Sequence, residues 1–156
     1  MRSVSALLLA VVALSGCLKK IPGTDIDDTT ETRSILATVD AYRIGVEQRN
    51  AQAVIDLADE SFRDNGGSSG PDDDLDYKTL FTVLPARFQK IDDVRLDLSV
   101  RRIEFDESAG NARVTYTYTM AFRMPSLSSK MQNETDIKQM TLKRVTDKQW
   151  KITSGL

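Results

Sequence analysis

Three tyrosines and one aspartate could together assemble a proton-transfer site. Tyr116 and Tyr118 share one parity of a long alternating segment, while Asp40 and Tyr42 stand close together in a segment with helical spacing. A phenol can donate a hydrogen bond to a developing oxyanion and a carboxylate can accept a proton, so this set would suit general acid–base chemistry. The simpler interpretation is that the tyrosines are core aromatics with hydroxyls at the rim, and that Asp40 lies on a solvated helix face.

The only cysteine, Cys17, completes a second pattern. Arg2 precedes an apolar run over residues 4–14, and two small residues separate this run from the cysteine. The run is shorter than the roughly 20 residues that a membrane-spanning helix needs, so it has the layout of an export signal. The order Leu14-Ser15-Gly16-Cys17 resembles the lipobox of bacterial lipoprotein precursors. A cysteine that simply ends a signal peptide or a buried helix would leave this order unexplained.

The lipobox resemblance implies that Cys17 receives a diacylglyceryl group, that residues 1–16 are removed, and that the new amino terminus is often acylated, with chains such as palmitate. Two or three acyl chains anchor a protein stably, whereas one is marginal. We therefore expect a lipid-anchored protein of the cell envelope. Leu18 rather than Asp follows the cysteine, which indicates the outer membrane, facing the periplasm, if the source is Gram-negative.

The overall charge excludes one class of partner. Loss of residues 1–16 removes one basic residue, Arg2, and moves the net charge from −2 to −3, so there is no basic excess to attract nucleic acid. Asp72, Asp74 and Asp76 have the spacing of a calcium loop, but Tyr77 and Val83 stand where an EF-hand needs Gly and Glu. We expect a solvated acidic loop whose last aspartate caps a helix, with no metal site and no cofactor.

The first half of the domain has helical periodicity. Residues 17–30 have the composition of a flexible tether, with a reach on the order of 20 Å. A helix should begin near Asp28, with Glu31 completing a capping box. Asn50 should cap a short second helix, residues 64–76 should form a loop, and a third helix should be disturbed at Pro85. The expected buried positions are Ile35, Val39, Tyr42 and Val46 in the first helix, Val54, Leu57 and Ala58 in the second, and Tyr77, Phe81, Leu84 and Phe88 in the third.

After Asp92 the period changes to two, which indicates strands. The first strand alternates over residues 94–105 and needs a bulge at Arg101-Arg102 to keep its apolar parity. A long strand over residues 113–124 must be curved. Met140 and Leu142 mark a third strand, and Trp150 and Ile152 mark a fourth. Helices followed by an antiparallel meander predict an α+β domain with the helices on one face of the sheet.

This order of elements resembles the nuclear transport factor 2-like superfamily, also called SnoaL-like, over residues 31–156. The Asn50-capped second helix, the long aromatic strand and the terminal Trp150-Lys151-Ile152 carry the resemblance. It implies three N-terminal helices packed on a strongly curved antiparallel sheet, a cone-shaped α+β barrel with an apolar pocket. The pocket-lining residues expected on this basis are Tyr42, Tyr116, Tyr118, Met120, Phe122 and Trp150.

The superfamily includes enzymes, binding modules and accessory domains, so its fold alone does not give a function. Its dehydratases rely on histidine, which this chain lacks, and its isomerases use a carboxylate base facing a tyrosine-containing oxyanion site. We expect a non-catalytic lipoprotein domain that binds a small apolar ligand or another envelope protein. The alternative is an isomerase- or hydrolase-type enzyme with Asp40, Tyr116 and Tyr118 as candidates. The outer sheet face of Thr115, Thr117 and Thr119 could mediate a homodimer or simply be solvated.

Overall fold

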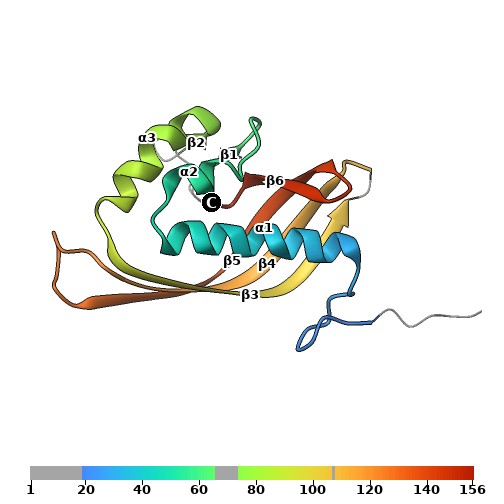
Figure 1. The fold of residues 1–156 in the computed structure, drawn as a ribbon, viewed down its shortest axis with the longest axis horizontal. Coiled ribbons are helices and arrows are strands. Elements are labelled where there is room, and N and C mark those ends of the chain that lie inside the picture. Colours follow the sequence, from blue (N-terminus) through green and yellow to red (C-terminus); the bar gives the residue numbers. More distant parts are fainter. Residues whose placement is uncertain (1–18, 66–73, 107) are drawn as a thin grey trace, which may run out of the picture.

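The computed structural model describes residues 19–65, 74–106 and 108–156. Three helices precede one large sheet, and Figure 1 shows them gathered on one face of it. The sheet is a meander in which each strand pairs antiparallel with the next in sequence, which confirms the α+β prediction. Its strands are β3 (Asp92–Asp106), β4 (Asn111–Arg123), β5 (Met131–Thr146) and β6 (Gln149–Ser154).

The bending of the sheet visible in Figure 1 has a local cause in β3. The β3–β4 register shifts between Val100 and Arg102, as the parity change in the sequence predicted. A second shift lies between Asp92 and Arg95, where Asp93 has a φ of 50°. Such bulges increase the twist of a strand and let an edge wrap around its cover.

The first helix, α1 (Thr30–Glu47), begins at a different cap from the predicted one. Thr29 accepts a hydrogen bond from the Thr32 amide at 3.1 Å, and the Thr32 hydroxyl accepts one from the Thr29 amide at 3.0 Å. This reciprocal pair is a capping box. The predicted partner, Glu31, instead pairs with Arg144 of β5. The predicted buried face, Ile35, Val39, Tyr42 and Val46, is confirmed.

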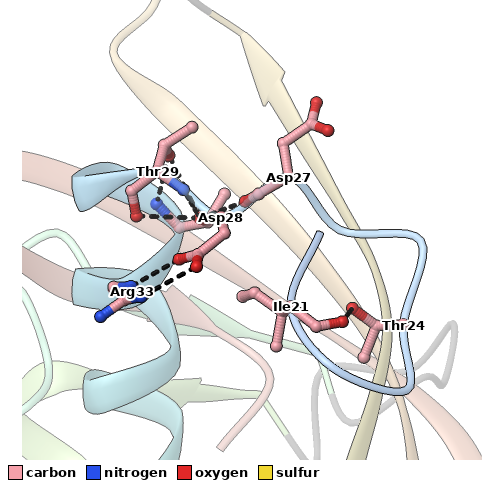
Figure 2. Close-up of polar contacts among 7 residues, drawn as sticks. Ile21, Thr24, Asp27, Asp28, Thr29 and Arg33 are labelled. Atoms are coloured by element: carbon pink, nitrogen blue, oxygen red, sulfur yellow. Dashed lines mark hydrogen bonds and ion pairs between the residues drawn. The ribbon is translucent and has the colours of Figure 1, made fainter. Parts of the chain in front are cut away.

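Residues 19–28 form a hydrogen-bonded turn ahead of α1, which we call the N-terminal turn. Lys19 and Asp28 are joined by a backbone hydrogen bond of 2.6 Å, and Ile21 and Ile26 by one of 2.9 Å. Figure 2 shows Arg33 of α1 facing the Asp28 carboxylate, with Nη2 to Oδ2 at 2.8 Å. From Lys19 onward the chain therefore differs from the flexible tether expected of its composition, because short-range hydrogen bonds hold it.

The second helix, α2 (Ala51–Ile55), has the predicted cap, since Asn50 Oδ1 accepts from the Ala53 amide at 3.0 Å. Val54 and Ala58 are buried as predicted, but Ile55 is buried where Leu57 was expected, and Leu57 is only partly covered. Two short strands, β1 (Arg63–Asp64) and β2 (Leu75–Asp76), pair at the ends of the predicted loop.

Asp76 caps α3 (Tyr77–Phe88) as predicted, accepting from the Thr79 amide at 2.8 Å. The predicted buried face was partly wrong, because Leu80 rather than Phe81 joins Leu84 and Phe88 in the core. Phe81 is 48% exposed and its ring meets the ring of Tyr77 edge-on. Tyr77 is partly buried against the core. α3 also packs against α2. Beyond Pro85 the helix ends with a tightened turn from Lys90 to Arg87.

Candidate functional site

A cavity of about 640 Å³ lies between the helices and the sheet. α1 contributes Tyr42 and Val46, α3 and the segment after it contribute Leu84, Phe88 and Ile91, and the sheet supplies the opposite wall. The volume falls in the usual range of small-molecule sites, about 300–1,000 Å³. The further lining residues are Val54, Asp64, Arg87, Lys90, Tyr116, Tyr118, Met120, Phe122, Met124, Glu134, Asp136, Lys138, Gln139, Gly155 and Leu156.

The sheet wall changes from apolar to charged between β4 and β5. Tyr116 pairs with Lys138, Tyr118 with Asp136, and Met120 with Glu134. Directly paired residues share a face of the sheet, so the three charged side chains stand on the cavity side. Further along β5, Met140 and Leu142 have the same parity and are fully buried under the helices. The charged stretch therefore marks the part of β5 that reaches beyond the helical cover.

The buried phenols of the cavity resist ionisation. Burial, followed by the nearby Asp64 carboxylate, raises the pKa of Tyr42 to about 12. Burial also raises the pKa of Tyr116, with added effects of Tyr42, Tyr118 and Asp64, and that of Tyr118, with added effects of Glu134 and Tyr42. All three hydroxyls thus keep their protons at neutral pH and can donate hydrogen bonds. The Tyr118 hydroxyl lies 2.6 Å from Met120 Sδ.

Asp64 holds the backbone that follows β6 (Gln149–Ser154) beside the cavity. Its Oδ2 atom accepts a hydrogen bond from the Gly155 amide at 2.6 Å, and the Gly155 carbonyl lies 3.4 Å from the Tyr116 hydroxyl. Gly155 has a φ of 89°, and a Cβ there would overlap the Gln139 carbonyl oxygen. Only glycine allows this close approach. One carboxylate and one phenol are thereby tied to the same backbone segment.

The structure brings together most of the residues that the sequence placed in a pocket. Tyr42, Tyr116, Tyr118, Met120 and Phe122 all line the cavity. Asp40 does not, and its candidacy as a base is corrected. It is exposed on α1 and pairs with Arg43 at 2.8 Å, because it falls on the helix face away from Tyr42.

A different carboxylate, that of Asp64, lines the cavity with the tyrosines. Asp64 is the first residue of the predicted loop, residues 64–76. Its one available signal is that it stands two residues after the fully buried Phe62, on the same parity.

Trp150 is a second correction, because it is buried but does not line the cavity. Its Nε1 atom donates to Ser34 Oγ of α1 at 3.1 Å, and its ring meets Phe105 and Arg144. Trp150 pairs with Arg144, toward the end of β5 farthest from Glu134. The Trp150 side chain points inward, as predicted. It packs against Ser34 near the start of α1, however, whereas the cavity residues Tyr42 and Val46 lie near the end of that helix.

Some sequence expectations fall outside this geometry. Cys17, Asp72 and Asp73 lie outside the described residues. Within residues 19–65, 74–106 and 108–156, no three acidic, histidine or cysteine side chains gather in a way that could hold a metal ion. No helix of the described part of the chain combines the length and the apolar content needed to cross a membrane.

Comparison with known proteins identifies the fold. No protein-family model and no curated protein matches the sequence. A solved structure of a candidate dehydratase of the nuclear transport factor 2-like family from Streptomyces avermitilis is 13% identical, with 81% of this chain and 94% of that chain covered at a TM-score of 0.66. A nuclear transport factor 2-like superfamily protein from Salmonella enterica is 11% identical. The match covers 81% of this chain and 88% of that chain, with a TM-score of 0.66. A ketosteroid isomerase-like protein from Erwinia carotovora is 15% identical. The match covers 80% of this chain and 92% of that chain, with a TM-score of 0.63. The chain therefore has the nuclear transport factor 2-like fold.

Proposed function

We propose that this chain is a cell-envelope lipoprotein whose domain binds a small, largely apolar ligand in the cavity between α1, α3 and the sheet. The observation that carries the proposal is the cavity itself. Its lining combines apolar and aromatic side chains with tyrosine hydroxyls and charged groups, and its volume is that of small-molecule sites generally. Tyr42 would orient a ligand by donating a hydrogen bond from a hydroxyl that stays protonated.

The anchoring part of the proposal rests on Leu14-Ser15-Gly16-Cys17 at the end of a short apolar run. Intact-mass analysis of protein extracted from membranes should show loss of residues 1–16 and added acyl mass on Cys17. Cys17→Ser should remain unprocessed. A soluble mature chain without acyl mass would contradict anchoring. In a Gram-negative host the protein should fractionate with the outer membrane, and recovery only with the inner membrane would contradict that placement.

The ligand-binding part can be tested with a fluorescent apolar dye such as anilinonaphthalene sulfonate. Phe122→Ala removes an aromatic ring from the cavity lining and should weaken dye binding several-fold. Phe81→Ala is the matched control, since that ring is 48% exposed and lies outside the lining. Equal dye affinity in both variants would place the dye elsewhere and would contradict the proposed site.

One observation favours a second function, an isomerase-type enzyme. The Asp64 carboxylate lines the same cavity as Tyr42 and Tyr116, and its charge acts on the pKa of both phenols. A carboxylate base facing protonated phenols could abstract a proton next to a carbonyl group and stabilise the resulting enolate. The ketosteroid isomerase-like protein named above is consistent with this class of chemistry.

The two functions are separable by one substitution. Asp64→Asn keeps an acceptor for the Gly155 amide but removes the base. An enzyme should catalyse deuterium exchange next to the carbonyl of an enolisable ketone, and Asp64→Asn should abolish that exchange while dye binding persists. No exchange above background with the unaltered protein, together with dye binding, would leave ligand binding as the function.

A further inference from the structure

Resting on the proposed lipid anchor, we infer that the domain stands on the membrane by its N-terminal turn, with its cavity at the far end. The surface apposed to the lipid is then the end carrying the β3–β4 turn. The cavity opens into the aqueous compartment, so its ligand enters from water rather than directly from the bilayer that holds the protein.

The first step is that the N-terminal turn belongs to the domain. Asp27 accepts a hydrogen bond from the Thr32 hydroxyl at 2.5 Å through its carbonyl oxygen, and its carboxylate pairs with Lys20 at 2.6 Å. The Asp28 side chain is only 7% exposed beneath Arg33. Ile26 is buried as well. These contacts fasten residues 19–28 to the first turn of α1 (Figure 2).

The second step is the short covalent connection to the anchor. Only Leu18 stands between Cys17 and Lys19. A fully extended chain spans at most about 3.6 Å per residue, so the two Cα atoms lie within about 7 Å of each other. This is much less than the reach on the order of 20 Å that a flexible tether of residues 17–30 would have. The acylated residue is therefore tethered to within about 7 Å of the first residue of the N-terminal turn.

The third step places the β3–β4 turn at the same end of the domain. The Gly110 carbonyl accepts a hydrogen bond from the Arg144 amide at 2.8 Å, and the Arg144 guanidinium pairs with Glu31 in the first turn of α1. Figure 1 accordingly shows the β3–β4 turn near the start of α1. Ala109, exposed in this turn, is therefore a marker for the anchored end.

The fourth step places the cavity at the other end. Tyr42 and Val46 stand 12 and 16 residues after Thr30, which is about 18–24 Å along a helix at a rise of about 1.5 Å per residue. Arg49, just beyond α1, donates to the carbonyl of the cavity residue Ile91 at 3.0 Å. The β4–β5 loop lies at this distal end in Figure 1. Leu127 belongs to this loop, between Arg123 at the end of β4 and Met131 at the start of β5.

The rim chemistry fits an aqueous entrance. Four charged residues of the cavity lining are exposed: Arg87 and Lys90, from α3 and the segment after it, and Glu134 and Asp136, from β5. Ionised groups of both signs are costly to bring into contact with hydrocarbon. Such a rim suits a ligand with an apolar body and a polar end that remains hydrated at the entrance.

Distance from the bilayer can be measured on the acylated protein in vesicles of phosphatidylethanolamine and phosphatidylglycerol. Ala109→Cys and Leu127→Cys each add one reactive thiol, because the Cys17 sulfur is occupied by its thioether. A fluorophore at position 109 should be quenched several-fold more by head-group spin-labelled lipid than one at position 127. Inserting ten Gly/Ser residues between Leu18 and Lys19 should remove the difference.

The outcomes separate the inference from the proposal beneath it. Equal quenching at both positions, or stronger quenching at position 127, in vesicle-bound protein would overturn the orientation while leaving the anchor intact. Protein that fails to bind vesicles would overturn the lipid anchor and the orientation with it. Both labelled side chains are exposed, and Leu127 is 73% exposed, so neither label should disturb folding.

Discussion

The Oε1 atom of Glu47 accepts a hydrogen bond from the backbone amide of Leu96 at 2.9 Å. Glu47 ends α1, whereas Leu96 lies in β3, the edge strand of the sheet. The amide points away from β4, so the carboxylate covers a donor that would otherwise be an open edge group. The second oxygen of Glu47 pairs with Arg43 at 2.6 Å. One side chain thereby joins the helix to the sheet next to the cavity.

Glu47→Ala should lower the free energy of unfolding by about 1.5–3 kcal/mol, because a partly buried amide loses a charged acceptor. Asp40→Ala is the matched control, since Asp40 pairs with the same arginine at 2.8 Å but is exposed on the helix. It should leave stability nearly unchanged. Urea unfolding of both variants tests this, and equal losses would refute the role of the Leu96 contact.

Trp150→Ala should be the most destabilising of the single substitutions considered, by about 3–5 kcal/mol, as for other buried aromatic truncations. The ring is 2% exposed between α1 and Phe105. Ser34→Ala removes only the partner of the indole nitrogen and should cost about 1–3 kcal/mol. Thermal unfolding should rank the two in this order. Because Trp150 lies outside the cavity, Ser34→Ala should leave dye affinity unaltered.

The sequence left two alternatives for the outer face of the sheet with Thr115, Thr117 and Thr119, a homodimer interface or a solvated face, and we propose the homodimer. Thr117 pairs with Ile137, which is 63% exposed at the middle of this face. Ile137→Lys should convert a dimer of residues 19–156 to a monomer in sedimentation analysis, while Val145→Lys, at a 50% exposed position nearer the end of β5, should not. A monomeric unaltered protein would contradict the prediction.

The sequence predicted the inward faces of the strands and the caps of two helices, Asn50 and Asp76. Alternation identified Tyr116, Tyr118, Met140 and Leu142 as inward residues, because a strand's period fixes the side of each side chain. It also located the bulge after Val100, since the apolar parity changes there. Periodicity does not specify which part of an inward row meets helices and which part meets a cavity. Trp150 was misplaced for this reason.

Asp64 has only a weak local signal, its shared parity with Phe62. Turn-forming residues follow it, and its place in the cavity depends on the Gly155 amide 91 residues later. The buried face of α3 was also predicted wrongly in part, because Leu80 rather than the larger Phe81 lies in the core. Long-range contacts of this kind have no short-range signature, whereas the caps at Asn50 and Asp76 do.

Gly155→Ala should weaken dye binding, because its Cβ would collide with the β5 backbone at Gln139 and Met140. The terminal segment would then leave β5 and release both Asp64 and Tyr116. Gly110→Ala is the control, since Gly110 also has a positive φ, 64°, but a Cβ there meets nothing within 4 Å. Alanine in this left-handed conformation is strained by about 1–2 kcal/mol, which should lower the free energy of unfolding without altering dye affinity. Equal dye affinity in the two variants would exclude Gly155 from the cavity's organisation.

Stability should fall at high pH because Tyr42 is buried as a neutral phenol. Its pKa is about 12 in the folded protein, against about 10 in an unfolded chain. The unfolded chain releases this proton first, so the contribution is complete below about pH 10 and is lost as the pH rises toward the folded value. By pH 11 the loss from Tyr42 alone should reach about 1 kcal/mol.

Urea unfolding at pH 8 and pH 11 should show a smaller decline for Tyr42→Phe than for the unaltered protein. Some decline should persist in that variant, because burial also raises the pKa of Tyr116 and Tyr118. Identical declines in both proteins would show that the Tyr42 hydroxyl reaches water in the folded state.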